Sequence, residues 1–283
     1  MATQVHPTAV VHPEAELGVD VIVGPYTVIG PAVKIGDRSQ LGPHVVVDGV
    51  TTMGADNIVI GQANLGGPPQ DLSYKGEATQ LEMGDRNTVR EFVTINRGTV
   101  KGGGITRIGN DCLFMACCHV AHDCDVRDRV IMANCVLLAG HCLVSQGVNI
   151  SGAAAAHHFV TIGAHAYIGG MTRINQDVPP FMLLEGHPAR VRGVNEIGLA
   201  RAGFAAADIE RLWVAFRLLY RSGDPKRRTI DTLRADPTNP QLVLDLLDNL
   251  EQTEQGQKGR YRESMRAEFR RVGEERILRG GQA

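Results

Sequence analysis

Aliphatic residues recur every six positions along most of the first 180 residues. Counting from Val5, every sixth residue through Leu65 is aliphatic or methionine. The period returns in phase at Met83 and, after a shift of one residue, runs from Ile108 to Ile174. Glycine often follows the periodic residue, and the residue four positions after it is usually small. A fixed short period over this length predicts a solenoid of repeated coils.

A six-residue repeat is too short for a helical repeat and fits one short strand with a corner. Three such sides close a triangular coil of about eighteen residues, with the periodic and small residues pointing inward and the glycines permitting the corners. This pattern resembles the hexapeptide-repeat left-handed parallel β-helix. The left hand follows from the resemblance, because crossovers are generally right-handed. Residues eighteen apart should then stack in columns, with neighbours about 4.8 Å apart.

Two segments interrupt the repeat. Residues 66–82 are polar, contain turn formers and return in phase, whereas residues 98–107 include three consecutive glycines and shift the phase by one. Both are predicted to be loops ejected from a continuous coil, and long loops on a rigid scaffold often carry function. The coil is expected to end at residues 178–180, because prolines cannot donate to a parallel ladder. The expected β-helix therefore spans residues 1–180.

The spacing of apolar residues becomes helical after the coil. Residues 204–221 and 241–250 each place apolar side chains on one helical face. The expected fold is therefore all-β, a left-handed parallel β-helix followed by a small C-terminal α-helical domain over residues 190–252. Residues 253–283 form a polar, arginine-rich tail of undefined role, in which residues 261–278 could be a third helix.

Composition and charge narrow the possible functions. Aromatic residues are scarce and glycine is abundant, as a narrow aliphatic coil requires. Residues 1–180 carry 11 Lys and Arg against 16 Asp and Glu, while residues 181–283 carry 18 against 15. The excess of basic residues at this end is too small to indicate nucleic-acid binding, but it suits an acidic protein partner. With no export segment after Met1 and no apolar run of membrane-spanning length, we expect a cytoplasmic protein without a membrane span.

Most of the six cysteines follow the repeat. Four of them occupy the small inward position, namely Cys112, Cys118, Cys124 and Cys142. We interpret them as reduced core residues in preference to disulfides or metal ligands.

Histidines are concentrated where the coil is most regular. His122 lies two residues after a periodic position, outside the inward set. The eighteen-residue offset places His122, Gly140 and His158 in one column and stacks Asp123 beneath His141. We predict that this column lines a catalytic site.

Two kinds of chemistry compete for this cluster. The H-x-x-H-D-C run could bind a metal, but ligands three apart suit a helical face, and adjacent solenoid positions are expected to point in divergent directions. General base catalysis needs an imidazole near its ordinary pKa, an acid that orients it and a backbone amide for the oxyanion. We favour the base. An intersubunit metal site and a structural or binding role remain open.

Several motifs are more specific than the repeat. They are Gln70-Asp71-Leu72 with Tyr74 and Gly76-Glu77, Gly84-Asp85-Arg86-Asn87, Arg97-Gly98-Thr99, His119-Val120-Ala121-His122-Asp123-Cys124, Leu138-Ala139-Gly140-His141, Asp177-Val178-Pro179-Pro180, Gly193-Val194-Asn195, Gly198-Leu199 and Arg217-Leu218-Leu219-Tyr220-Arg221-Ser222-Gly223. Together they resemble the acyl-ACP:UDP-N-acetylglucosamine acyltransferases that open lipid A synthesis, from the first coil to about Leu250.

The resemblance implies a role for each matching residue. His122 would take the proton from the sugar 3-position as it attacks the thioester of a 3-hydroxyacyl acyl carrier protein, Asp123 would orient His122, and the Gly140 amide would stabilise the oxyanion. The implied substrate-binding residues are Asp71, His119, His141, His158, Gly170, Asn195 and Arg201. Gly170 would close the acyl groove and leave room for a long chain. The resemblance also implies a homotrimer with active sites between coils, and no cofactor or metal.

Four positions depart from the family pattern: Ser73 replaces a lysine, His158 a glutamine, Ile197 an acidic residue and Ala202 an arginine. These changes concern sugar and uridine recognition and could accompany a 3-amino sugar acceptor, which would give an amide. The rival functions are a γ-class carbonic anhydrase with zinc between subunits and a non-catalytic nucleotide-sugar-binding coil. The later N-acyltransferase of the same pathway has a domain before its coil, whereas here the repeat begins at Val5.

The basic residues of the helical end have two interpretations. They could meet the acidic carrier protein or form a solvated face. They are Arg217, Arg221, Lys226, Arg227 and Arg228.

Overall fold

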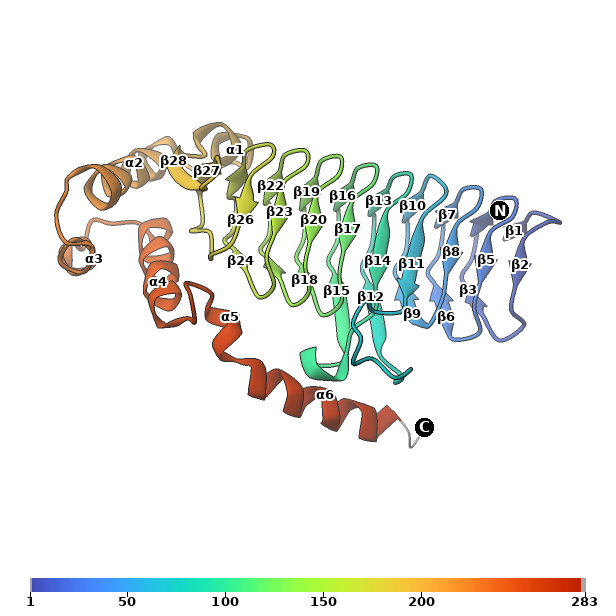
Figure 1. Cartoon of the computed structure of the whole chain (residues 1–283). Coiled ribbons are helices and arrows are strands. Elements are labelled where there is room, and N and C mark those ends of the chain that lie inside the picture. The colour runs from blue at the N-terminus through green and yellow to red at the C-terminus, as the bar shows by residue number, and fades with distance from the viewer. Residues whose placement is uncertain (1, 281–283) are drawn as a thin grey trace.

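The computed structural model describes residues 2–280, and Figure 1 shows a long coil of short strands that leads into a group of helices. Strands three apart in the chain pair with one another, and the pairings along the coil are parallel. The strands therefore form three sheets, one for each side of the coil. This arrangement confirms the expected left-handed parallel β-helix with helices after it.

The sheets differ in length. The first contains β1 (Gln4–Val5), β4 (Ile22–Val23), β7 (Gln40–Leu41), β10 (Ile58–Val59), β13 (Thr88–Val89), β16 (Leu113–Phe114), β19 (Ile131–Met132), β22 (Asn149–Ile150), β25 (Tyr167–Ile168), β27 (Met182–Glu185) and β28 (Arg190–Val194). The second contains β2 (Val10–Val11), β5 (Val28–Ile29), β8 (Val46–Val47), β11 (Asn64–Gly67), β14 (Thr94–Asn96), β17 (His119–Val120), β20 (Leu137–Leu138), β23 (Ala155–Ala156) and β26 (Arg173–Ile174). The third contains β3 (Glu16–Leu17), β6 (Val33–Ile35), β9 (Val50–Met53), β12 (Gln80–Met83), β15 (Ile105–Ile108), β18 (Asp125–Val126), β21 (Leu143–Val144) and β24 (Thr161–Ile162).

The pairing register follows the eighteen-residue coil. Val5 pairs with Val23, eighteen residues later. Val50 instead pairs with Gln80, so the first loop adds twelve residues, which is two whole repeats, and the pattern returns in phase. Gln80 pairs with Ile105, so the second loop adds seven residues and shifts the phase by one. Both interruptions seen in the sequence are therefore loops ejected from a continuous coil.

The periodic residues fill the centre of the coil. Nearly all of them from Val23 to Ile174 are buried in one continuous cluster, with Phe114 among its largest fully buried side chains. The four inward cysteines belong to the same cluster and are free thiols. Burial raises the pKa of the Cys112 and Cys118 thiols to about 11. These thiols are therefore protonated core residues, as the sequence predicted.

The glycines of the repeat have a different role from the predicted one. The left-handed corner conformations belong mainly to other residues, such as Asp20 and Arg38, whereas Gly18 and Gly42 have no positive φ. A Cβ at Gly42 would overlap the carbonyl oxygen of Ile60 in the next coil. Glycine follows the periodic residue because adjacent coils approach too closely there for a side chain, and not because it forms the corner.

Gly42→Ala is therefore expected to destabilise the coil by about 1–3 kcal/mol, because the new methyl group must push two coils apart. The measurement is the free energy of unfolding in denaturant. Gly152→Ala is the matched control, since a Cβ there would lie an ordinary 3.4 Å from the Asn134 carbonyl oxygen. Equal stability of the two variants would refute this explanation of the glycines.

The coil does not stop at the prolines. Val178 still bridges to Ile162, and β27 then adds to the first sheet beside β25. The chain turns back in β28, which pairs antiparallel with β27. The prediction of an end at residues 178–180 was wrong because Pro179 and Pro180 occupy the connection before β27, where no ladder hydrogen bond is required.

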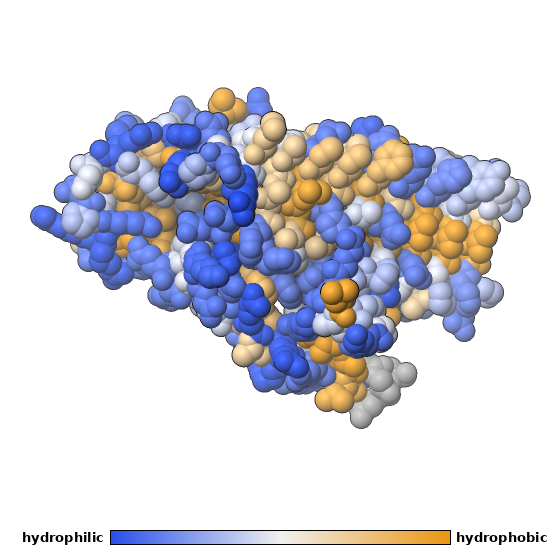
Figure 2. Space-filling model, viewed as in Figure 1, coloured by the Kyte–Doolittle hydropathy of each residue, from blue (hydrophilic) through white to orange (hydrophobic). Residues whose placement is uncertain are grey.

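The first four helices pack beyond the hairpin around a second apolar cluster that includes Leu212, Ile230 and Leu246, whereas the last two run back along the coil. The first four are α1 (Glu196–Arg201), α2 (Ala206–Arg221), α3 (Lys226–Ala235) and α4 (Gln241–Gln255), and the last two are α5 (Tyr261–Ser264) and α6 (Arg266–Gly280). The short 3₁₀ helix η1 (Val100–Gly102) lies in the second ejected loop. Helices α1 and α3 were not predicted from the sequence, and α4 ends five residues later than expected. Within residues 2–280, no helix has the length and apolar character needed to cross a bilayer. The visible surface of the helical end is mostly hydrophilic (Figure 2).

Candidate active site

The corners of three successive coils stack into one column. Asp123, His141 and Phe159 each have φ between 62° and 66°, and each lies eighteen residues after the one before. Aspartate and histidine tolerate this left-handed conformation better than most residues, whereas phenylalanine does not. The residues immediately before these corners are His122, Gly140 and His158, so the two columns predicted from the sequence lie side by side.

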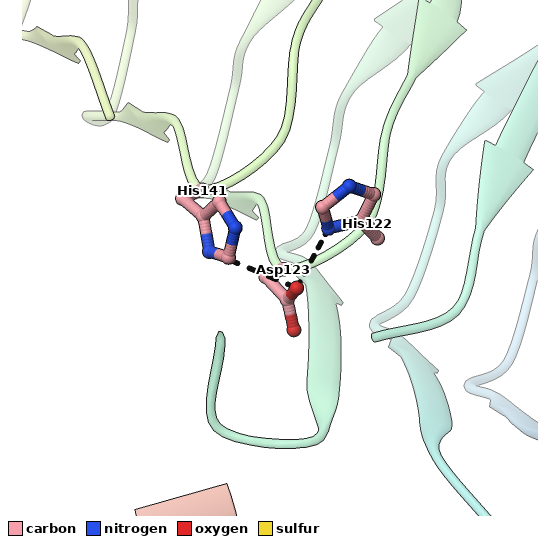
Figure 3. A group of neighbouring side chains, drawn as sticks. All are labelled: His122, Asp123 and His141. Atoms are coloured by element: carbon pink, nitrogen blue, oxygen red, sulfur yellow. Dashed lines mark hydrogen bonds and ion pairs between the residues drawn. The ribbon is translucent and has the colours of Figure 1, made fainter. Parts of the chain in front are cut away.

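His122, Asp123 and His141 form a buried group. Their exposed fractions are 6%, 3% and 7%. Figure 3 shows the Asp123 carboxylate between the two imidazoles. The Nδ1 atom of His122 lies 2.7 Å from Oδ2 of Asp123, and Nδ1 of His141 lies 3.7 Å from the same oxygen. The short contact assigns the His122 proton to Nδ1, which leaves Nε2 with a lone pair to accept a proton.

The second ejected loop holds the Asp123 carboxylate. The Thr99 amide donates to Oδ1 at 2.7 Å and the Thr99 hydroxyl to Oδ2 at 2.6 Å, while the Asp123 amide donates to the Thr106 hydroxyl at 2.8 Å. A Cβ at Gly102 would overlap the carboxylate. These hydrogen bonds fix the position of the Asp123 carboxylate, so the loop holds it where it can orient His122.

Gly140 lies directly beside His122. A Cβ on Gly140 would be 2.6 Å from Cε1 of the His122 ring. Among the described residues 2–280, the Gly140 amide finds no hydrogen-bond acceptor. A bare backbone and a free donor beside the His122 imidazole are what an oxyanion site requires.

His141 is a neutral ring held by stacking. It lies 4.2 Å from Phe159, with the two rings parallel. Burial lowers the pKa of His141 to about 4, although the nearby Asp123 carboxylate acts in the opposite direction. Its Nδ1 atom makes no hydrogen bond within the described part of the chain. Because Nδ1 is buried on the Asp123 side, Nε2 is the His141 atom that the ring can offer to a substrate in the pocket.

The low pKa of His141 predicts a loss of stability in acid. The unfolded chain binds a proton below its ordinary pKa of 6.5, and the folded chain does so only near 4, so stability falls as the pH drops between these values. The integrated loss is roughly 3 kcal/mol. His141→Phe should lose less stability than wild type over this range, measured by denaturant titration at several pH values.

The pH dependence of wild-type stability does not isolate His141, because Asp177 changes the stability in the opposite direction as the pH falls. Wild type must therefore be compared with His141→Phe. Burial raises the pKa of Asp177 to about 6, so its contribution to stability grows as the pH falls. The difference between wild type and His141→Phe cancels this effect. Parallel pH curves for the two proteins would contradict the assigned state of His141.

A pocket of about 570 Å³ opens in front of the two columns. It contains four of the predicted residues, Asp71, His122, His141 and His158. Six further residues line it: Gln70, Leu72, Lys101, Phe159, Arg266 and Arg270. Phe159 could have been found by adding eighteen to His141. No signal in the sequence indicated that Arg266 and Arg270 would return to this pocket.

Three other predicted residues, Asp71, His119 and His158, have pKa values lowered by their surroundings. Burial alone would raise the pKa of Asp71, but hydrogen bonds from Ser73 and an ion pair with Lys101 lower it to about 2. His119 is not part of the pocket lining, its Nδ1 lies 2.7 Å from the Thr94 hydroxyl, and burial lowers the pKa of its ring. Burial also lowers the pKa of His158, with help from neighbouring cationic groups. Asp71 is thus an anion and a strong acceptor.

Besides His119, three predicted substrate-binding residues do not line this pocket within one chain. Asn195 caps α1, where it accepts a hydrogen bond from the Gly198 amide and donates one to the His165 carbonyl oxygen. Arg201 lies at the end of the same helix, and Gly170 lies at a corner near Gly152. A single chain therefore assembles the predicted acid–base group but not the whole predicted substrate site.

The same group has a donor set that suits a metal. One ligand atom from each of His122, Asp123 and His141 lies within 4.8 Å of the others. The expectation that adjacent coil positions diverge was wrong here, because the side chains of His122 and Asp123 meet in a hydrogen bond. Two imidazoles and a carboxylate can bind zinc, so geometry alone supports both a metal and a base.

Comparison with known proteins identifies the family of the chain. Residues 177–258 match the family model described as UDP N-acetylglucosamine O-acyltransferase, domain 2, and residues 14–49 match bacterial transferase hexapeptide repeats. The acyl-[acyl-carrier-protein]–UDP-N-acetylglucosamine O-acyltransferase of Gloeothece citriformis is 48% identical over 253 residues, which cover 89% of this chain and 91% of the relative. This chain belongs to that acyltransferase family.

Other members of the acyltransferase family agree. The enzyme of the same name from Verminephrobacter eiseniae is 51% identical over 86% of this chain and 94% of its own. The UDP-N-acetylglucosamine acyltransferase structure from Bacteroides fragilis has a TM-score of 0.85 at 33% identity and covers 88% of this chain and 97% of its own. The Acinetobacter baumannii structure has a TM-score of 0.82 at 40% identity over 86% and 96%.

Proposed function

We propose that this chain transfers a 3-hydroxyacyl group from acyl carrier protein to the 3-hydroxyl of UDP-N-acetylglucosamine, the first step of lipid A biosynthesis. The observation that carries the proposal is the buried contact of His122 with Asp123, which leaves Nε2 of His122 free to accept a proton. The names of the relatives supply the substrates.

His122 acts first as a base and then as an acid. Its Nε2 takes the proton of the sugar hydroxyl while the hydroxyl oxygen attacks the thioester carbonyl carbon. The Gly140 amide donates to the oxyanion that forms. When the tetrahedral intermediate collapses, the carbon–sulfur bond breaks and the carrier thiolate receives the proton from the His122 imidazolium. Asp123 stabilises that imidazolium throughout.

Asp71, His119, His141 and His158 are the residues of this chain that hold the acceptor near His122. Gly170, Asn195 and Arg201 complete the site from a second copy in a homotrimer, which explains why one chain does not bring them to the pocket. Light scattering of the purified protein measures the assembly. We also propose that the enzyme acts in the cytoplasm, as expected from its acyl carrier protein and nucleotide-sugar substrates.

The experiment that tests the acceptor compares UDP-N-acetylglucosamine with its 3-amino analogue. The expected product with the natural sugar has the mass of the acylated nucleotide sugar and is cleaved by mild alkali, as an ester is. A product only from the amino sugar, stable to alkali, would show that the departures at Ser73, His158, Ile197 and Ala202 mark an amide-forming enzyme.

A further inference from the structure

The C-terminal helix α6 returns along the coil to the active-site pocket. Figure 1 shows it running back beneath the strands toward the N-terminal end of the coil. It packs on η1, where a Cβ on Gly273 would overlap the Val100 carbonyl oxygen. The match to the family model ends at residue 258, so it assigns no role to α5 or α6.

The segment before α6 is fastened to the coil. The Tyr261 amide donates to Oδ2 of Asp177 at 2.8 Å, and Arg260 donates to the Asn175 carbonyl oxygen at 2.9 Å. Arg262 donates to the carbonyl oxygen of His141, also at 2.9 Å, so one contact reaches the active-site column itself. These contacts fix where α6 begins relative to His141.

Two arginines of α6 face the pocket. The Arg266 guanidinium lies 4.4 Å from the centre of the Phe159 ring, whose other neighbour is His141. Arg270 is one helical turn further on, and both line the pocket together with Lys101. Three cationic side chains therefore surround the space in front of His122.

Each cation keeps most of its donors available. Arg266 is paired with Glu263 at 2.9 Å, Arg270 with Glu274 at 3.1 Å and Lys101 with Asp71 at 3.2 Å. A guanidinium has five N–H donors in a planar fork, and one carboxylate contact leaves the others free. Such forks bind phosphate oxygens in pairs.

We propose that Arg266 and Arg270 form a phosphate-binding subsite that α6 adds to the acyl-transfer pocket. The inference rests on the proposed function, whose two substrates both carry phosphate: the diphosphate of the nucleotide sugar and the phosphate of the carrier's pantetheine arm. The arginines hold that phosphate so that the reacting groups meet at His122.

The test measures KM for each substrate in Arg266→Gln, Arg270→Gln and the double variant. Loss of charge-assisted hydrogen bonds should raise the KM of one substrate by about tenfold in the double variant and leave kcat nearly unchanged. Replacing both arginines with lysine should recover part of the loss. Arg271→Gln is the matched control, because Arg271 makes the same type of i,i+4 ion pair, with Glu275, outside the pocket.

The substrate that responds identifies the phosphate. A raised KM for UDP-N-acetylglucosamine assigns the subsite to the diphosphate. A raised KM for acyl carrier protein that persists with acyl-phosphopantetheine assigns it to the arm. An effect that disappears with acyl-phosphopantetheine would place the arginines against the carrier protein surface and overturn the proposal.

Two further outcomes separate the inference from the function. An active wild type with unchanged KM values in the double variant, or with an equal effect in Arg271→Gln, would overturn the inference alone. A wild type without transfer activity would overturn the proposed function and the inference with it.

Discussion

His122→Ala is expected to transfer acyl groups about 10²–10⁴-fold more slowly than wild type, because removing a general base costs that range of rate. The imidazole has a short contact to a buried carboxylate and lines the pocket beside the free Gly140 amide. No other side chain among residues 2–280 combines these features. The measurement is the initial rate of ester formation at neutral pH with both substrates saturating.

The matched control for that variant is His44→Ala. His44 is an exposed corner histidine, stacked on Tyr26 in the N-terminal coils and absent from the pocket. It should retain wild-type activity, and thermal unfolding should show that both variants are folded. If His122→Ala kept a rate within a few-fold of wild type, the base would have to be another group.

Asp123→Asn is expected to lower kcat by up to about 10⁴-fold, as occurs when the carboxylate of a histidine–carboxylate pair loses its charge. The new amide would face the Thr99 hydroxyl and amide donors and the Nδ1 proton of His122. His122 would then favour the tautomer with its proton on Nε2, which cannot act as the base. The measurement is kcat across the pH range, with binding of UDP-N-acetylglucosamine followed separately.

The control for Asp123→Asn is Asp128→Asn. Asp128 also accepts a backbone hydrogen bond between coils, from the Asn110 amide at 2.8 Å, but it lies outside the histidine pocket. A structural role for Asp123 would lower the stability of both variants similarly and leave kcat alone. A pure loss of nucleotide-sugar binding in Asp123→Asn would likewise contradict its role in orienting the base.

The coil and its acid–base group could be predicted from the sequence because the repeat places residues at constant intervals along the coil. Each inward residue occupies an equivalent place, so the aliphatic pattern predicts the core. The constant offset of eighteen residues predicts that His122, Gly140 and His158 share a column. The same offset would also have placed Phe159 against His141. In a periodic sequence, the constant offset alone therefore identifies residues that are neighbours in three dimensions.

The parts that could not be predicted depend on contacts without a period. Position 42 requires glycine because adjacent coils approach closely there, and this distance cannot be read from the sequence. Helix α3 was missed because its apolar residues Ile230 and Leu233 are few and surrounded by charge. The return of α6 depends on single hydrogen bonds such as that from Tyr261 to Asp177. Contacts of this kind leave no trace in local spacing.

The site therefore combines two levels of organisation. The repeat places His122 and Asp123 on the coil, and the ejected loop then holds the carboxylate through Thr99. Helix α6 lies on that loop and adds cationic side chains to the pocket. The repeat positions the acid–base pair, and the segments outside the repeat supply the residues around it.

The most direct test is transfer by purified wild-type protein from 3-hydroxyacyl carrier protein to UDP-N-acetylglucosamine, with a metal chelator present throughout. Both the carrier thiol released and the sugar ester formed are counted. We predict equal amounts of thiol and ester, at a rate that the chelator does not change. Thiol release without ester, or ester formation that stops with the chelator and returns with zinc, would contradict catalysis by His122 as a metal-free base.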